Sequence, residues 1–451
     1  MPNCYNGHEV SIIKNNAMNN FHTSPLICLP GHTPSCDILI GAAAIRALPD
    51  VLEKLGADRV CLVADVNTFS AAGKAVCEIL QEVGTTVSTH VFDAEPLEPN
   101  EYSVGLAAMS VDPNCKAIIG VGSGVINDIC KILANLTEKP YVIVATAPSM
   151  DGYASATSSM ERQGLKVSLN SKCPDVIIGD TDILAQAPKQ ALVSGLGDML
   201  AKYVSICEWR ISHLINGEYY SEEIADMVRL ALKKCVDHAD GLLLREHSAV
   251  EAVFEGLIIC GIAMSYAGLS RPASGCEHYI SHVLDMRAAQ FHTPTSTHGL
   301  QCAMGTLQTV RLYEKLKNIT PDPVKACAYV ENFRYEDWCQ RLRELLGDGA
   351  ETMIALEKRE GKYDPEKHAQ RLKVLLDNWG AVLEIMAQEL PSADWLEQLL
   401  DRLDAPKTLS DLGIEDSMMP VILEATRDIR DKYVLSRILW DLGITAKEIL
   451  S

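Results

Sequence analysis

Three places in the sequence carry side chains that could together bind a divalent metal ion. The first is Asp198, in the segment 194–203 (SGLGDMLAKY), the second is the pair His278 and His282, and the third is His298, which precedes a glycine. One carboxylate with two or three imidazoles is a donor set that suits a divalent metal and leaves a position open for a substrate. The sequence therefore predicts a metal site, provided that the fold brings these residues together.

The spacing of these residues adds to the prediction. Asp198 lies in a run with helical periodicity after Ala187 and Pro188, so we expect it in a first or second helical turn, where the helix dipole alone could favour a carboxylate. His278 and His282 are four residues apart in an apolar helical pattern, which places both rings on one face. A lone histidine there would more often be a core residue, whereas this pair together with His298 favours a metal site.

A glycine-rich loop precedes these residues in the chain. The segment 120–128 (GVGSGVIND) follows a strand pattern and opens a helix, a context in which backbone N–H groups can face a pyrophosphate. It differs from the usual G-x-G-x-x-G pattern, because Asn127 takes the place of the third glycine. A nucleotide site is the favoured interpretation, and a tight turn without a ligand is the alternative.

Two further features would lie near such a nucleotide site. The segment 146–155 (TAPSMDGYAS) follows the next strand pattern, and ligands of parallel sheets collect at the carboxyl ends of strands. Its hydroxyl groups could instead cap their own backbone. Asp65 ends an earlier strand, where an acid can accept a hydrogen bond from a ribose hydroxyl or can simply be a solvated strand end.

The composition restricts the class of protein. The chain has 451 residues with 47% hydrophobic and 22% charged residues, as in ordinary soluble proteins, and two domains are the natural expectation. The formal net charge of -20 argues against nucleic acid or an anionic membrane as the main partner. The 15 cysteines form no C-x-x-C pairs, which indicates free thiols in a reducing, cytoplasmic setting. We expect neither a signal peptide nor membrane insertion.

The order of patterns predicts the fold class. Short apolar strands alternate with helices up to about residue 190, which is typical of an α/β domain with a parallel sheet, and the rest of the chain is almost entirely helical in pattern. We therefore expect an α/β dinucleotide-binding domain over 1–188 and an all-α metal- and substrate-binding domain over 189–451. Residues 1 to about 35 are expected to be an extended lead-in, and 164–169 with 175–179 a hairpin or a strand pair. The expected strands are 59–64, 86–92, 117–121 and 141–145, and the expected helices between them are 42–55, 71–83, 102–109 and 125–136.

Five ordered motifs carry a family resemblance. The segments GVGSGVINDICK, TAPSMDGYAS, SGLGDMLAKY, SRPASGCEHYISH and HGLQCAMG resemble those of the sn-glycerol-1-phosphate dehydrogenases, within the superfamily of metal-dependent polyol dehydrogenases and dehydroquinate-synthase-like enzymes. The resemblance covers about residues 37 to 310. One departure is Leu300, because relatives often have an acid or a polar residue there.

The resemblance implies an active site in the cleft between the two domains. It implies that Asp198, His278 and His298 hold a divalent metal, usually zinc and sometimes nickel or iron, and that Asp151, Asp198 and His282 face the substrate as catalytic residues. The residues that it implies in contact with NAD(P) are Asp65, Gly122, Ser123, Gly124, Val125, Ile126, Thr146, Ala147, Pro148, Ser149 and Ser155.

The reaction implied is the reversible, metal-dependent reduction of dihydroxyacetone phosphate to sn-glycerol 1-phosphate with NAD(P)H. Alternatives within the superfamily are a dehydrogenase of a non-phosphorylated polyol such as glycerol, and a sugar-phosphate cyclase. A catalytically silent binding protein is a further alternative, which an intact Asp/His/His set disfavours. Lys202 and Arg271 are the cations nearest to the motifs and could bind the substrate phosphate or form structural ion pairs. A homo-oligomer is expected.

Overall fold

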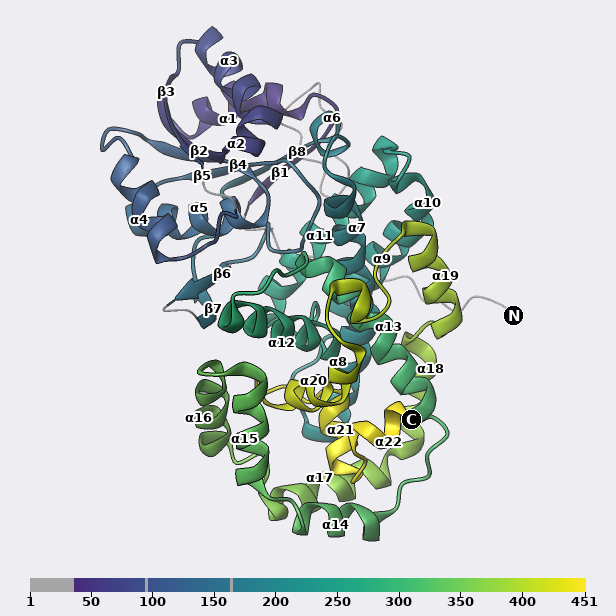
Figure 1. Cartoon of the computed structure of the whole chain (residues 1–451). Helices are drawn as coiled ribbons and strands as arrows, with labels where there is room; N and C mark the ends of the chain where they lie inside the picture. Colours follow the sequence, from purple (N-terminus) through teal and green to yellow (C-terminus); the bar gives the residue numbers. More distant parts are fainter. Residues whose placement is uncertain (1–35, 94–95, 163–164) are drawn as a thin grey trace.

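The computed structural model describes residues 36–93, 96–162 and 165–451, and the expected lead-in over residues 1 to about 35 lies outside them. The first part of the chain forms a six-stranded parallel sheet in the order β1-β8-β5-β4-β2-β3 (Figure 1). Its strands are β1 (Asp37–Gly41), β2 (Arg59–Asp65), β3 (Thr86–Phe92), β4 (Ala117–Gly122), β5 (Tyr141–Ala145) and β8 (Val176–Asp180).

Helices cover both faces of the sheet, as its apolar strands require. β4, β5 and β8 are buried along their whole length, which fits the unbroken apolar runs of a parallel sheet. On one face α1 (Leu48–Lys54) and α3 (Lys74–Glu82) pack on the strands, and on the other α5 (Gly124–Thr137) does so with α4 (Glu101–Ser110) beside it. The predicted α/β class and its parallel sheet are confirmed.

One predicted strand pairing is wrong. We expected 164–169 to pair with 175–179, but β7 (Leu165–Asn170) pairs antiparallel with β6 (Thr157–Arg162), and β8 joins the main sheet beside β1 and β5. The apolar run of β8 is suited to burial on both faces. In contrast, β7 alternates apolar and polar residues and β6 begins with alternating exposed and buried residues, as an outlying hairpin does. This hairpin projects from the sheet toward the helical part (Figure 1).

From residue 181 onward the chain is helical, in agreement with the predicted loss of strand patterns after residue 189. A core of four helices, α7, α11, α12 and α13, packs against the sheet region, with α9, α18 and α19 beside it and the other C-terminal helices at the end away from the sheet (Figure 1). The helices in this part are α6 (Thr181–Leu184), α7 (Lys189–Leu200), α8 (Lys202–Asn216), α9 (Glu222–Asp237), α10 (Ala239–Leu242), α11 (His247–Ala267), α12 (Cys276–Phe291), α13 (His298–Leu316), α14 (Pro323–Glu331), α15 (Tyr335–Leu346), α16 (Gly349–Glu360), α17 (Pro365–Asp377), α18 (Trp379–Glu389), α19 (Ala393–Leu403), α20 (Met419–Ala425), α21 (Leu435–Asp441) and α22 (Ala446–Leu450).

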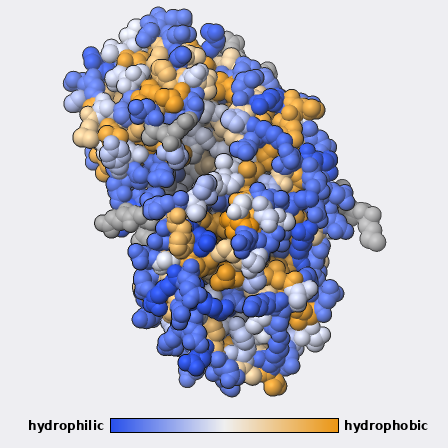
Figure 2. All heavy atoms as spheres, viewed as in Figure 1, coloured by the Kyte–Doolittle hydropathy of each residue, from blue (hydrophilic) through white to orange (hydrophobic). Residues whose placement is uncertain are grey.

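Within the described residues, α11 is the helix long and apolar enough to cross a membrane, with a mean hydropathy of 1.6. Of that stretch, 78% is buried inside the protein. Such burial is that of the core helix of a globular protein, so the helix is weak evidence for a membrane span. The visible outer surface is largely hydrophilic (Figure 2), in keeping with the excess of acidic residues.

Candidate functional site

The crossing of α7 and α13 brings the predicted metal ligands together. A Cβ atom on Gly299 would lie 1.8 Å from the carbonyl oxygen of Ser194, and a Cβ atom on Gly197 would lie 2.2 Å from the carbonyl oxygen of Gly299. The backbone N–H of Gly299 also donates a hydrogen bond to Ser194 Oγ over 3.1 Å. Only glycine permits two helix backbones to come this close. This contact places Asp198 of α7 beside His298, the first residue of α13.

Asp198 does not lie in the helical turn that we predicted. α7 begins at Lys189, directly after its N-cap Pro188, so Asp198 is in the last turn of the helix rather than the first or second. The helix dipole therefore does not favour its charge. The carboxylate is fully buried and accepts hydrogen bonds from Lys202 Nζ (2.9 Å) and from the backbone N–H of Asp151 (2.9 Å). Burial alone would raise the pKa of Asp198, but the charges of Lys202 and His278 outweigh it and hold the pKa well below its usual range.

Both histidines are oriented through their Nδ1 atoms. His278 Nδ1 lies 2.8 Å from Glu277 Oε1, and His298 Nδ1 lies 2.9 Å from Ser281 Oγ. The Nε2 atoms remain for a ligand, and His278 Nε2 lies 3.4 Å from Asp198 Oδ1. Metal-binding histidines commonly use one ring nitrogen for the metal and the other for such a supporting hydrogen bond.

A fourth donor, Cys302, belongs to the same cluster. Asp198, His278, His298 and Cys302 each offer one donor atom, and these atoms all lie within 4.8 Å of one another. Ligands at about 2.0–2.3 Å from one ion lie roughly 3–4 Å apart, so the set fits a divalent metal. Burial would raise the pKa of the Cys302 thiol, but the neighbouring charges of His278 and His298 lower it. Cys302 was not among the predicted ligands, although its position four residues after His298 on a helix was a usable signal.

His282 lies beside this cluster rather than in it. Its ring stacks against that of His298, with ring centroids 6.0 Å apart, and its side chain is half-buried. The centre of the Tyr279 ring also lies 6.2 Å from that of His282. His278 and His282 share one face of α12, as their spacing predicted. His282 is therefore placed next to a ligand bound at the metal cluster.

Lys202 is committed to the framework of the site. Its fully buried ammonium group donates to Asp151 Oδ2 (2.7 Å), to Asp198 Oδ1 (2.9 Å) and to the carbonyl oxygen of Ala273 (3.0 Å). Since an ammonium group has three hydrogens, these bonds satisfy it. Asp151 is thereby locked to Lys202. Of the two roles left open for Lys202, the structure supports the structural ion pair rather than the phosphate contact.

Arg271 is likewise committed to a structural ion pair. Its side chain is 1% exposed and forms two-pronged hydrogen bonds with the carboxylate of Glu218. It also donates to Ser212 Oγ and to the carbonyl oxygen of Tyr433. A guanidinium group with these partners has little left to offer a substrate phosphate.

The predicted cofactor residues gather at one edge of the sheet. Asp65, the glycine-rich loop and the loop after residue 145 follow β2, β4 and β5, which are neighbours in the sheet. The two loops touch, because Ser123 Oγ lies 2.5 Å from Ser149 Oγ and the backbone N–H of Thr146 donates to the carbonyl oxygen of Gly122. At Gly122 a Cβ atom would lie 2.5 Å from the Cβ atom of Ile126, so the turn into α5 needs a glycine. The predicted loop residues thus lie together, from Gly122, Ser123, Gly124, Val125 and Ile126 to Thr146, Ala147, Pro148 and Ser149.

Two of the predicted cofactor residues also have structural partners. Asp65 caps the short helix α2 (Val66–Thr68), and its Oδ1 atom accepts both cap hydrogen bonds, from the N–H groups of Asn67 and Thr68. The Ser155 hydroxyl is turned toward the buried Lys131 Nζ (3.1 Å) and the carbonyl oxygen of Thr157 (3.0 Å). Ser155 therefore supports its own loop in this structure, and its contact with a cofactor stays a prediction.

The loop after β5 connects the cofactor edge to the metal cluster. Ser194 Oγ of α7 donates a hydrogen bond to the carbonyl oxygen of Ser149 over 3.0 Å, and a Cβ atom on Gly195 would lie 1.7 Å from the carbonyl oxygen of Pro148. Farther along the loop, the N–H of Asp151 reaches Asp198. The predicted nucleotide loop and the predicted metal ligand are thus packed directly against each other.

Glu277 contacts the His278 ring, and a substitution at Glu277 can test whether this contact strengthens metal binding. Its Oε1 atom contacts His278 Nδ1 and accepts from the N–H of Gly275, and the whole side chain is buried. Replacing Glu277 with Gln should lower the affinity for a divalent metal about 10- to 100-fold while His278 stays in place. Titration of the metal-free protein with zinc, with Glu331→Gln on the surface of α14 as control, measures the effect. Unchanged zinc affinity in Glu277→Gln would show that this contact does not tune the site.

Comparisons with known proteins agree with this geometry. Residues 39–188 match the family described as iron-containing alcohol dehydrogenase. A glycerol-1-phosphate dehydrogenase (NAD(P)+) of Bacillus velezensis is 33% identical over 294 residues, which cover 63% of this chain and 75% of the relative. Another, from Halalkalibacterium halodurans, is 27% identical over 402 residues, or 88% of this chain and 90% of the relative.

Solved structures support the fold. The crystal structure of glycerol dehydrogenase from Schizosaccharomyces pombe matches with a TM-score of 0.59 and 19% identity, covering 92% of this chain and 89% of that one. At this identity the likeness establishes the fold alone. The sequence relatives assign the family: this protein is an oxidoreductase that belongs to the glycerol-1-phosphate dehydrogenase family, within the iron-containing alcohol dehydrogenase superfamily.

Proposed function

We propose that the protein catalyses the reversible reduction of dihydroxyacetone phosphate to sn-glycerol 1-phosphate with NAD(P)H and a divalent metal. The observation that carries the proposal is the meeting of Asp198, His278 and His298 at one buried point against the loop after β5. The names of the sequence relatives support the substrate. A dehydrogenase of a non-phosphorylated polyol is the second candidate, because the structural relatives include a glycerol dehydrogenase.

Asp198, His278 and His298 would hold the metal, which supplies Lewis-acid polarisation of a substrate carbonyl. NAD(P)H supplies the hydride, and the loops after β4 and β5 would bind its pyrophosphate through backbone N–H groups. His282, half-buried beside His298, can hold the proton that the product oxygen takes up. Lys202 and Asp151 keep the Asp198 carboxylate in a fixed orientation and neutralise the charges that burial would otherwise penalise.

The donor set favours zinc as the metal. Cys302 adds a thiol to the carboxylate and the two imidazoles, and thiolate ligands select zinc over harder metals. Replacing Cys302 with Ser should therefore weaken binding of zinc more than binding of manganese, by about tenfold or more. Competitive titration with zinc and manganese gives the ratio of the two affinities for the unaltered protein and for Cys302→Ser. If the zinc-to-manganese ratio is unchanged in Cys302→Ser, the thiol is not a ligand and gives no reason to prefer zinc.

The coenzyme preference follows from Asp65. An acid at the ribose repels a 2′-phosphate, so we propose a preference for NADH over NADPH. We further propose that the protein is cytoplasmic, because the described cysteines are free thiols, and that it is a homo-oligomer. Light scattering on the purified protein measures the subunit number.

One assay tests the proposed reaction. Oxidation of NADH by dihydroxyacetone phosphate should be rapid with zinc or nickel present and should be lost after chelation, and chiral analysis should identify the product as sn-glycerol 1-phosphate. Faster turnover of dihydroxyacetone itself would favour the polyol dehydrogenase. Conversion of a sugar phosphate without net NADH consumption would favour a cyclase, and no turnover with any of them would favour a binding protein.

A further inference from the structure

A half-buried lysine, without an ion-pair partner among the described residues, contacts the start of α12, the helix that carries His278. Lys432 Nζ donates to the carbonyl oxygen (3.1 Å) and to the hydroxyl (2.6 Å) of Ser274, and it lies 5.8 Å from the ring centre of Tyr279. Arg430 donates to Ser168 Oγ of β7 over 2.9 Å. Neither side chain forms an ion pair with any carboxylate in the part of the chain that the structure describes. In a protein with 60 acidic and 40 basic residues, two such cations side by side need an explanation.

Local electrostatics disfavour this arrangement unless an anion is present. Burial lowers the pKa of Lys432 well below its usual range, and the charges of Arg271 and Arg430 lower it further. The carboxylates of Glu277 and Glu218 act in the opposite direction but do not outweigh these causes. Both Arg430 and Lys432 are nevertheless only half-buried, so a small molecule can reach them. A bound anion would offset the repulsion and restore a fully charged Lys432.

Lys432 is connected to the metal cluster by two short routes. Its partner Ser274 directly follows Ala273, whose carbonyl oxygen accepts from Lys202, the side chain that also binds Asp198. Along α12, the rings of Tyr279, His282 and His298 follow one another with centroid distances of 6.2 and 6.0 Å. Lys432 is therefore linked to the metal cluster through Ser274 and through the Tyr279 ring. In a three-carbon ketone phosphate only a methylene group and an oxygen separate the carbonyl from the phosphorus, so a phosphate site has to lie on the same face of the protein as the metal cluster.

The C-terminal helices hold the segment 429–434 firmly in place. On one side Asp428 accepts hydrogen bonds from Trp338 Nε1 (2.6 Å) and from the Tyr363 hydroxyl (2.8 Å). On the other side the N–H of Leu435 donates to the buried Glu208 over 2.7 Å, and the Tyr433 hydroxyl donates to Asp441. A segment fixed at both ends presents its cations in a defined position.

We propose that Lys432, with Arg430, forms the site for the phosphate group of the substrate, an inference that rests on the proposed function. It assigns a role to the C-terminal helices, which carry the two cations from a distant part of the sequence to the metal cluster. It also explains why Lys202 and Arg271 can remain in structural ion pairs. Removal of the Lys432 charge should therefore affect phosphorylated substrates and leave unphosphorylated ones unaffected.

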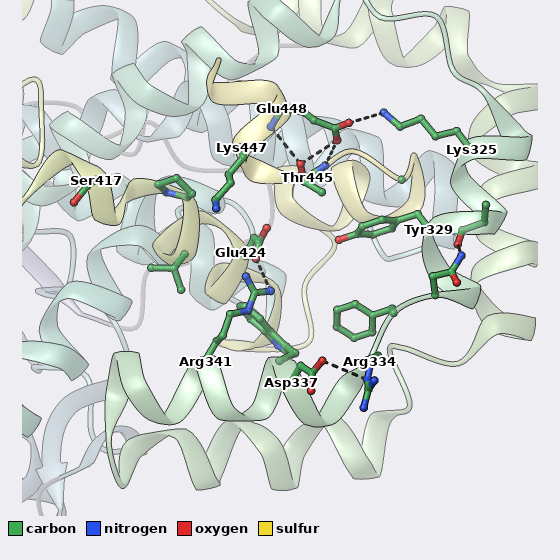
Figure 3. A pocket seen from close by; sticks show the side chains of 17 residues that line it. Lys325, Tyr329, Arg334, Asp337, Arg341, Ser417, Glu424, Thr445, Lys447 and Glu448 are labelled. Carbon is green, nitrogen blue, oxygen red and sulfur yellow. Dashed lines mark hydrogen bonds and ion pairs between the residues drawn. The ribbon is translucent and has the colours of Figure 1, made fainter.

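A cavity among the C-terminal helices also has basic side chains, but most of them are paired with acids. A pocket of about 900 Å³ lies between α14, α15, α20 and α22 and is lined by several basic side chains (Figure 3). Three of them are paired with acids in the same lining: Lys325 with Glu448, Arg334 with Asp337 and Arg341 with Glu424. Lys325 therefore serves as a control, since its charge is already neutralised by a neighbour.

The test compares Lys432→Met with Lys432→Arg and Lys325→Met. For Lys432→Met, the KM for dihydroxyacetone phosphate should rise about 10- to 100-fold, as expected for loss of a charge-assisted hydrogen bond, with little change for dihydroxyacetone. Lys432→Arg should recover part of the loss, and Lys325→Met should behave as the unaltered protein. If Lys432→Met does not fold, Arg430→Gln tests the same site and should give a smaller increase of the same kind.

A second measurement separates this inference from the reaction itself. Inorganic phosphate should raise the melting temperature of the unaltered protein and of Lys325→Met but not that of Lys432→Met. If the unaltered protein fails to reduce dihydroxyacetone phosphate yet shows this difference, the proposed reaction fails and the anion site stands. If the unaltered protein reduces dihydroxyacetone phosphate and Lys432→Met has the same KM and the same phosphate response as Lys325→Met, the phosphate site is overturned and the reaction stands.

Discussion

The His278→Ala protein is expected to lose at least about 1,000-fold in kcat/KM for its ketone substrate, because loss of a metal removes several kcal/mol of transition-state stabilisation. His278 is 5% exposed, its Nε2 atom lies 3.4 Å from Asp198 Oδ1, and with His298 it supplies the imidazoles of the cluster among the described residues. Asp198→Ala should have an effect of the same size. Metal content per chain should fall together with activity, while the circular dichroism spectrum stays that of the folded protein.

The control for this variant is His238→Ala, because His238 is exposed at the end of α9. That protein should keep its metal and its activity. The opposite result would be full activity in a His278→Ala protein from which all metal has been removed. Such a protein would exclude the proposed reduction by a metal centre at this position.

The Gly299→Ala substitution is expected to have the largest effect on folding, about 3 kcal/mol of lost stability. The new methyl group would lie 1.8 Å from the carbonyl oxygen of Ser194 and 2.7 Å from its hydroxyl. Since backbone atoms cannot rotate away as a side chain can, α7 and α13 would have to separate. Separation would also move His298 away from Asp198, so zinc affinity should fall along with the free energy of unfolding, as measured by denaturant titration.

Gly105→Ala is the matched control. Gly105 lies inside α4, and a Cβ atom there would meet nothing within 4 Å. Its replacement should therefore stabilise the protein slightly, by about 0.5–1 kcal/mol, because alanine loses less backbone entropy in a helix. Equal stability of the Gly299→Ala and Gly105→Ala proteins would mean that the close approach of α7 and α13 is not required.

The sequence predicted the features that depend on local pattern. The apolar runs of β2, β4 and β5 and the glycine loop before α5 were recognisable, because burial on both faces of a parallel sheet leaves unbroken apolar segments. The side chains of Asp198, His278 and His298 also converge as their types and order suggested. These features depend on short-range rules and on a family resemblance spanning several motifs.

Features that depend on tertiary packing were not predictable in the same way. Asp198 was expected in a first or second helical turn because the predicted start of the helix lay later in the chain than Lys189, where α7 begins. The charge of Asp198 is stabilised by Lys202 rather than by a helix dipole. The pairing of Arg271 with Glu218 brings together residues far apart in the chain. No sequence pattern indicated a role for Lys432, because its contact with Ser274 joins residues more than a hundred positions apart in the chain.

The most direct test of the central claim is a crystal structure of the zinc-loaded protein with anomalous diffraction recorded at the zinc edge. We expect a single strong anomalous peak within about 2.0–2.3 Å of an Asp198 carboxylate oxygen and of the Nε2 atoms of His278 and His298. A peak elsewhere, or none among these side chains, would contradict the account.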